Sequence, residues 1–187
     1  TMIGHGGLDS DGEKGAAGAV IDIDVDSVVA EAGDGNSGFT QIGHGGGDGT
    51  TGDATAEITI DAAVGGVSFN GGAGTDSFAL IGNGGIVSGA SNAAGAITVT
   101  TPGDLTIGAG TGQTAFAAFG HAGFDADGTK DGNIDLNVTG DILLSGGGAA
   151  GQSGAFGLIG HGGTNSDGAK TGTITLDADG ATGLTID

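Results

Sequence analysis

The sequence predicts an all-β fold, a right-handed parallel β-helix (β-solenoid) with about one three-stranded rung per repeat. Three observations predict it. A glycine-rich pentapeptide returns about every 39 residues, short runs of alternating apolar and polar residues follow each copy, and no run has helical spacing. A repeat of this length is typical of solenoids, in which each turn completes the hydrophobic core of its neighbours. Parallel strands joined by crossovers wind right-handed.

The pentapeptide has the form apolar-Gly-His-Gly-Gly. Its copies begin at Ile3, Ile42, Ile81, Phe119 and Ile159. They divide a single solenoid segment, residues 1–187, into repeats at about 3–41, 42–80, 81–118, 119–158 and an incomplete 159–187. Because neither end has an atypical capping repeat, we expect the chain to be a window of a longer array. A less favoured interpretation splits each period into two turns of about 20 residues.

Each repeat contains three apolar runs, which predict three strands. The first run, Phe-Ala-Leu-Ile at 78–81, leads into the pentapeptide, and a glycine-rich acidic loop follows. The second run alternates strictly, as in Ile-Thr-Val-Thr at 97–100, which is the pattern of a half-buried strand. A short turn, 102–104 in the third repeat, leads to the third run at 105–107. Glycine at the corners would allow positive φ at little steric cost.

The strongly negative net charge argues against nucleic acid and anionic lipid as partners. The chain has three lysines, no arginine and a net charge of −20. Such a surface repels nucleic acid and anionic lipid, so we expect neither as a partner, whereas divalent cations or basic partners would be attracted. No stretch reaches the roughly 18 apolar residues of a membrane helix, so this segment is not expected to insert into a membrane. Without cysteine, the chain has no disulfide framework.

One polar position recurs in all five copies of the pentapeptide. It is occupied by His5, His44, Asn83, His121 and His161. In a stacked coil these side chains would form a ladder, one strand spacing apart. A row of imidazoles could bind a transition metal, or each side chain could hydrogen-bond a glycine-rich corner. The second interpretation is favoured, because asparagine can replace those hydrogen bonds but is a poor ligand for zinc or copper.

The loops after the pentapeptide contain Asp/Asn-x-Asp-Gly units, which resemble the opening of calcium loops built from oxygen ligands. The candidate Ca²⁺ ligands are Asp9, Asp11, Glu13, Asp125, Asp127, Asn165 and Asp167, with Asp76 as a weaker candidate in a lone Gly-Gly-x-Gly-x-Asp stretch. Plain solvated turns are the competing interpretation, because Asp and Gly are common turn residues. The lysines, each 11 residues after the start of a pentapeptide, predict local ion pairs or contacts between filaments.

Catalysis has little support in the sequence. Cysteine and arginine are absent, so a thiol nucleophile and an arginine clamp are excluded. No G-x-S-x-G elbow accompanies the serines and histidines. The acidic residues recur with the repeat, whereas an active site normally breaks a repeat. We therefore expect a protein that is not an enzyme and has no catalytic residues.

The sequences of the repeats, for example AFGLIGHGG at 155–163 and GTITLDADG at 172–180, resemble those of bacterial filamentous-haemagglutinin-type and autotransporter-adhesin repeat proteins. The resemblance implies a right-handed β-helix within a large secreted protein, and it carries over no catalytic residue. The expected function is a structural or adhesive fibre or stalk segment, extracellular or at the cell surface. Its expected assembly is self-association into fibres or stacking of neighbouring repeats. The alternative is a β-solenoid module that binds calcium or surface glycans.

Overall fold

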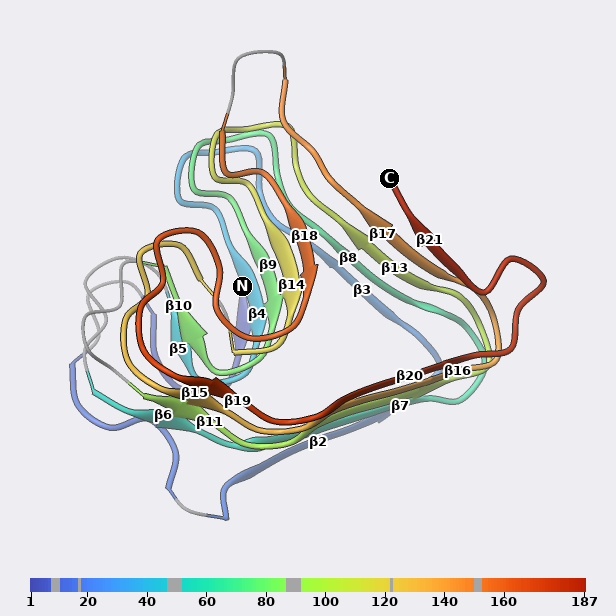
Figure 1. The fold of residues 1–187 in the computed structure, drawn as a ribbon, viewed down its shortest axis with the longest axis horizontal. Coiled ribbons are helices and arrows are strands. Elements are labelled where there is room, and N and C mark those ends of the chain that lie inside the picture. The colour runs from blue at the N-terminus through green and yellow to red at the C-terminus, as the bar shows by residue number, and fades with distance from the viewer. Residues whose placement is uncertain (8–10, 17, 47–51, 87–91, 122, 150–152) are drawn as a thin grey trace.

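The computed structural model describes the chain except for residues 8–10, 17, 47–51, 87–91, 122 and 150–152. The described residues form β-strands joined by turns, and they include no helix that could cross a membrane. The strands wind into a coil whose successive turns lie on one another (Figure 1). The prediction of an all-β parallel solenoid is therefore confirmed.

Three five-stranded parallel sheets form the coil. The first-run sheet contains β1 (Met2–Ile3), β4 (Thr40–Ile42), β9 (Ala79–Ile81), β14 (Ala117–Phe119) and β18 (Gly157–Ile159). The second-run sheet contains β2 (Val20–Val25), β7 (Glu57–Ala62), β12 (Ile97–Thr101), β16 (Ile134–Val138) and β20 (Ile174–Ala178). The third-run sheet contains β3 (Val28–Glu31), β8 (Val67–Asn70), β13 (Leu105–Gly108), β17 (Ile142–Ser145) and β21 (Leu184–Ile186).

The strand register fixes the length of a turn. In the second-run sheet Ile58 pairs with Ile97 and Ile97 with Ile134, so equivalent residues of successive repeats are direct neighbours. At the pentapeptide, backbone-to-side-chain hydrogen bonds join residues 38, 39 or 40 positions apart. One repeat therefore makes one turn, and the interpretation with two turns per repeat is wrong.

Each turn contains more strand than the three predicted runs. The pentapeptide glycines pair as β5 (Gly45–Gly46) with β10 (Gly84–Gly85). A further sheet forms from parts of the predicted loops, namely β6 (Ala54–Thr55), β11 (Ala93–Ala94), β15 (Lys130–Asp131) and β19 (Lys170–Thr171). These strands arise because each turn repeats the backbone path of the previous one, so even polar and glycine-rich segments meet a parallel neighbour. The three predicted runs thus form the three large sheets of the coil, and these two-residue strands add to them in the loops.

The main core lies inside the three large sheets. Its side chains form columns along the coil axis, such as Ile21, Ile58, Ile97 and Ile134, and the inner members are fully buried. A turn alone could not shield these side chains, and the turns above and below exclude the water. The alternating polar positions, including Thr98, point away from the core.

A second core lies on the other face of the first-run sheet. Leu80 and Phe78 pack there with Ile86, which follows the pentapeptide, so Ala79, Leu80 and Ile81 of β9 are all fully buried. Phenylalanines stack along the axis in this core. The stack is Phe39–Phe78–Phe116–Phe156, with ring centroids 5.2, 5.0 and 5.2 Å apart. The chain after the pentapeptide therefore folds back over the sheet and gives it two buried faces.

Candidate functional site: the polar ladder and the lysine-filled loops

The recurring His/Asn position forms a continuous hydrogen-bonded ladder. In each turn the backbone N–H at this position donates to the side chain at the same position of the next turn. The acceptors are Nδ1 of His44 for His5 (2.9 Å), Oδ1 of Asn83 for His44 (2.8 Å), Nδ1 of His121 for Asn83 (3.0 Å) and Nδ1 of His161 for His121 (3.1 Å). The ladder thus joins all five copies of the pentapeptide.

The other end of each ladder side chain reaches a backbone carbonyl. Nε2 of His121 lies 2.8 Å from the Gly95 oxygen, and Nε2 of His161 lies 2.8 Å from the Gly132 oxygen. Asn83 Nδ2 donates to the oxygens of Ala56 and Ala94 at 2.8 and 2.7 Å. Because Nδ1 accepts an N–H, we assign the proton of His121 and His161 to Nε2. Both ring nitrogens are then engaged, which leaves no lone pair for a metal.

The ladder favours neutral imidazoles. The rings of His121 and His161 stack with centroids 5.0 Å apart, as do those of His5 and His44. Burial lowers the pKa of His121 to about 4, and the nearby His161 acts in the same direction. Burial and the neighbouring His5 also lower the pKa of His44. A proton added at Nδ1 would abolish the acceptor that the preceding turn uses, so protonation and ladder formation oppose each other.

The lysines fill the Asp-Gly loops. Lys130 is 1% exposed, and its ammonium group donates to the backbone oxygens of Ala126 (2.8 Å), Gly128 (3.0 Å) and Asp127. Lys170 donates to Ser166 and Gly168 in the same way, and Lys14 donates to Gly12. Burial, with a smaller contribution from Lys170, lowers the pKa of Lys130 to about 8, and Asp127 opposes that shift. An ammonium group therefore lies where loop carbonyls converge.

Among the described residues, the predicted calcium ligands do not come together in one site. Asp125 and Asn165 occupy turns with φ of 51° and 54°, and Oδ1 of Asp127 accepts the Asp167 N–H at 3.2 Å. Asp11 and Glu13 are exposed, and Asp9 lies outside the described residues. Within the described ranges, no three His, Asp or Glu side chains are close enough to hold a metal ion. In these loops a calcium ion would therefore have to compete with the lysine ammonium groups for the same space.

Asp76, the weaker calcium candidate, has a different set of neighbours. Its side chain accepts the hydroxyl of Thr114 in the next turn, and its backbone N–H donates to the Gln113 oxygen at 2.9 Å. It has φ of 57°, a conformation that Asp tolerates in turns. Asp76 thus links two turns at a corner. Asp34, Asp104 and Asp141 make similar links by accepting backbone N–H groups of the following turn.

Sequence reasoning identified the ladder positions but missed the phenylalanine stack and the role of the lysines. Both had a signal in the sequence. Phenylalanine recurs three residues before the pentapeptide in four repeats, and the three Asp-Gly loops are the ones that carry a lysine three residues after the Asp. The regular offset indicates a stacked position, and the joint occurrence of lysine and Asp-Gly indicates that the two belong to one loop structure.

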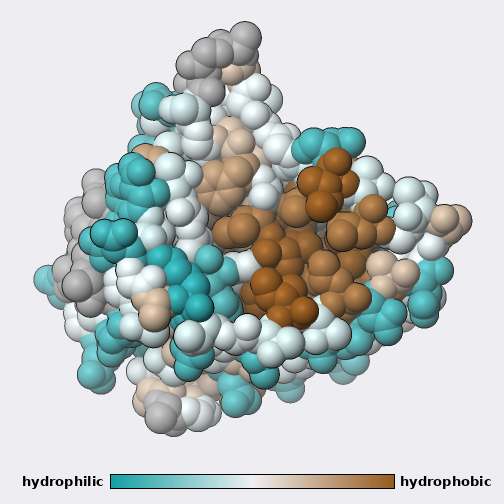
Figure 2. Space-filling view, in the orientation of Figure 1, coloured by the Kyte–Doolittle hydropathy of each residue, from teal (hydrophilic) through white to brown (hydrophobic). Residues whose placement is uncertain are grey.

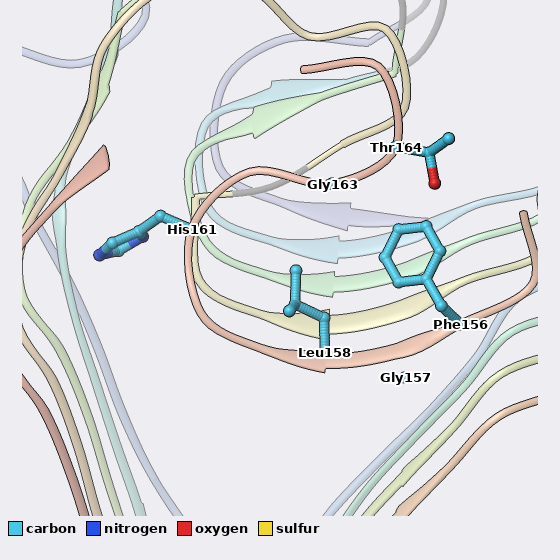
Figure 3. A pocket seen from close by; sticks show the side chains of 6 residues that line it. All are labelled: Phe156, Gly157, Leu158, His161, Gly163 and Thr164. Carbon is cyan, nitrogen blue, oxygen red and sulfur yellow. The ribbon is translucent and has the colours of Figure 1, made fainter. Parts of the chain in front are cut away.

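An open pocket of about 410 Å³ lies at the C-terminal end of the ladder (Figure 3). Phe156, Leu158, His161 and Thr164 line it. Phe156 is the last ring of the stack and His161 the last member of the ladder. The pocket therefore marks the place where a further turn would continue both columns.

Comparisons with models of protein families, with curated proteins and with solved structures found no match. The fold itself, a parallel β-solenoid with turns about 39 residues apart, follows from the strand register. Membership of the adhesin repeat proteins therefore stays a prediction from the amino-acid sequence of the repeats.

Proposed function

We propose that this chain is a structural, non-enzymatic segment of an extracellular fibre or stalk, part of a secreted surface protein of the adhesin kind. The observation that carries the proposal is the ladder from His5 to His161, which joins every turn to the next through side chain and backbone. Such a column resists separation of the turns. A segment built in this way is suited to hold its two ends at a fixed distance.

The remaining contacts between turns support the same role. Stacked phenylalanines and columns of isoleucine run parallel to the ladder, so apolar burial and hydrogen bonds act in one direction. The outward positions of the second-run sheet carry Asp and Thr in register, for example Asp22 beside Thr59 and Thr98 beside Asp135. Threonine between acidic residues spaces the charges, which limits repulsion along the axis.

A single-molecule pulling experiment tests the proposal. The chain has no cysteine, so one cysteine added at each end allows specific attachment of handles. A load-bearing solenoid is expected to resist force and then release one turn at a time, each step adding about 130 Å of extended chain for roughly 39 residues. Extension without discrete steps, at forces that stretch an unfolded chain, would contradict the proposed function.

A cation-binding module is the second candidate, and one observation favours it. Asp24 and Asp61 are exposed and directly paired on the second-run sheet, and like charges in register destabilise a sheet unless a cation screens or bridges them. Calcium that binds here would raise the melting temperature above that of the same chain in magnesium at equal ionic strength. The Asp61→Asn variant removes one carboxylate and should lose that increase. A melting temperature that calcium leaves unchanged eliminates this candidate.

A further inference from the structure

The third copy of the pentapeptide joins Asn83 to Gly84, and the fold places a demand on each of them. Position 83 needs a side chain that accepts a hydrogen bond on one side and donates on the other, which an amide or an imidazole provides. At position 84 the backbone has φ of 105°, which favours glycine. The other four copies carry histidine at the ladder position, so the third alone contains an Asn-Gly pair.

An Asn-Gly pair carries a chemical liability that a His-Gly pair lacks. In an unfolded chain the Gly84 nitrogen can reach Cγ of Asn83, because glycine has no side chain to obstruct the approach. After base removes the proton of this nitrogen, a bond forms from nitrogen to Cγ, the Cγ–Nδ2 bond breaks, and ammonia leaves with the removed proton. Water then opens the resulting succinimide ring at either carbonyl and leaves aspartate or isoaspartate at position 83.

We propose that Asn83 is a deamidation site that is open to reaction while the chain is unfolded and closed once the turns have stacked. The reaction needs only water and the chain itself. Its product lacks a group that the ladder requires, so a chain that folds late loses the ability to complete the third turn. The inference goes beyond the structural role, because it identifies a covalent modification that folding suppresses.

The folded chain holds the reacting groups in hydrogen bonds. The Gly84 N–H donates to the His44 oxygen at 2.7 Å, so the attacking nitrogen is engaged and its proton is shielded from base. Oδ1 of Asn83 accepts the His44 N–H at 2.8 Å, and Nδ2 donates to the oxygens of Ala56 and Ala94 at 2.8 and 2.7 Å. The succinimide ring can close only if several of these bonds break together.

Burial keeps water and base away from the same atoms. The exposed fraction of Asn83 is 0%, and the ladder residues on either side, His44 and His121, are also buried. Figure 2 shows that apolar side chains fill the centre of the coil, between β18, β20 and β21, so the interior favours neither an ionised backbone nitrogen nor free water. Reaction at Asn83 therefore requires local opening of the turns.

A second Asn-Gly pair in the chain serves as an internal comparison. Asn70, the last residue of β8, is only half-buried, and together with Gly71 it lines an open groove of about 320 Å³. Its Nδ2 donates to the Ser68 hydroxyl of its own strand at 3.0 Å, whereas Nδ2 of Asn83 bonds backbone oxygens. The Gly71 N–H donates to the Gly108 oxygen at 2.8 Å. We therefore expect weaker protection at Asn70 than at Asn83.

Aspartate at position 83 could not complete the ladder. A carboxylate accepts hydrogen bonds but does not donate them, so the oxygens of Ala56 and Ala94 would face a buried negative charge. Asn83→Asp should therefore lower the melting temperature by about 10 °C. Asn83→His provides an acceptor and a donor again and should melt close to the unmodified chain.

Peptide mass spectrometry after incubation at mildly alkaline pH measures the reaction at both pairs. In guanidinium chloride that unfolds the chain, Asn83 and Asn70 should lose ammonia at similar rates. In the folded chain the rate at Asn83 should fall at least about a hundredfold, the factor for two net hydrogen bonds that must open first, and the rate at Asn70 should fall less. Equal rates at Asn83 in the two states, or equal protection of the two pairs, would overturn the inference.

A variant of the next ladder residue tests where the protection comes from. His121→Leu removes the acceptor of the Asn83 N–H and leaves the side-chain partners of Asn83 in place. Local opening should therefore increase, and the rate at Asn83 in the folded chain should rise about tenfold. His121→Asn keeps an acceptor and should react like the unmodified chain. Equal rates at Asn83 in the two variants would exclude the ladder as the source of protection.

The refolding yield measures the consequence for the chain. After incubation in guanidinium chloride and dilution, the unmodified chain should lose refolding yield, read by circular dichroism, in step with the loss of ammonia at Asn83. Asn83→His should keep its yield. Asn70→Ser, which introduces the residue of the matching position Ser145, should lose yield like the unmodified chain. If Asn83→His loses yield as fast as the unmodified chain, modification at Asn83 does not limit folding and the inference fails.

Discussion

At position 83 an asparagine replaces histidine in the ladder and makes the same two kinds of contact. Its Oδ1 accepts the His44 N–H as Nδ1 of a histidine would, and its Nδ2 donates to carbonyl oxygens as Nε2 would. The five repeats thus allow histidine and asparagine to be compared at one equivalent position. It shows that the position requires an acceptor on one side and a donor on the other, and that an imidazole is one of two solutions.

This equivalence leads to a prediction for the buried His121. Replacement by leucine removes the acceptor of the Asn83 N–H and the donor to the Gly95 oxygen, so His121→Leu should lower the free energy of unfolding by about 3 kcal/mol. His121→Asn should cost about 1 kcal/mol, since it keeps both groups and loses only the ring volume and the stacking on His161. Urea denaturation of the two variants measures the difference. Equal losses would show that the ladder hydrogen bonds contribute nothing specific.

The lysines allow a similar comparison of a buried and an exposed copy. Lys130→Met removes the donor of the half-buried Gly128 oxygen and one of the two donors of the buried Ala126 oxygen, which keeps the Ser166 hydroxyl, so we expect a loss of about 2 kcal/mol in the free energy of unfolding. Lys170→Met makes the same change in an exposed loop and should cost under about 1 kcal/mol, because water can replace the ammonium group. If both variants unfold at the same urea concentration as the unmodified chain, the loops do not depend on lysine.

At the scale of the strand, the alternating runs predicted the second-run and third-run sheets well. Residues such as Ile97 and Val99 point inward and Thr98 outward, as period-two alternation requires. The first-run sheet was predicted less completely, because both of its faces are buried. Alternation cannot reveal a second core when Ala79, Leu80 and Ile81 are all apolar, and an apolar run without alternation fits several structures.

The sequence predicted where the polar residues of the site lie in each turn, but not their hydrogen-bond partners. A constant offset showed that His121 and Asn83 share a place in the turn, but the partners Gly95 and Ala56 lie 26 and 27 residues earlier in the chain. The path of a whole turn is needed to bring these atoms together. For the same reason the sequence predicted local ion pairs for the lysines of the Asp-Gly loops but not that the Lys130 ammonium group binds the loop carbonyls.

The pentapeptide glycines make a prediction at this scale. Gly82 has φ of 149°, and a Cβ built on it would lie 2.0 Å from the Gly120 oxygen of the next turn. Gly82→Ala should therefore lower the free energy of unfolding by about 3 kcal/mol, since backbone atoms of two turns would have to move apart. Gly35→Ala is the matched control, because nothing lies within 4 Å of its Cβ and its φ is not positive. A stable Gly82→Ala variant would contradict the close stacking of the turns.

For the whole molecule, the ladder predicts sensitivity to acid. His121 has a pKa of about 4 in the folded chain and an ordinary pKa near 6.5 when unfolded, so the unfolded chain binds more protons between these values. Its stabilising contribution is complete above pH 6.5 and is lost as pH falls toward 4, by about 3 kcal/mol in total. His121→Asn should lose less stability over this window, which urea denaturation at several pH values measures. Identical pH profiles would contradict the role of the neutral ring.

The central claim is that successive turns, 38 to 40 residues apart, lie directly on one another, and a disulfide measures this most directly. Thr98 and Asp135 pair in register on adjacent turns. Because the natural chain has no cysteine, the double variant Thr98→Cys/Asp135→Cys should form an intramolecular disulfide on mild oxidation. The control pair Thr59→Cys/Asp135→Cys spans two turns, about 10 Å, and should stay reduced. A bridge in the control pair, or none in the adjacent pair of a folded chain, would contradict the solenoid.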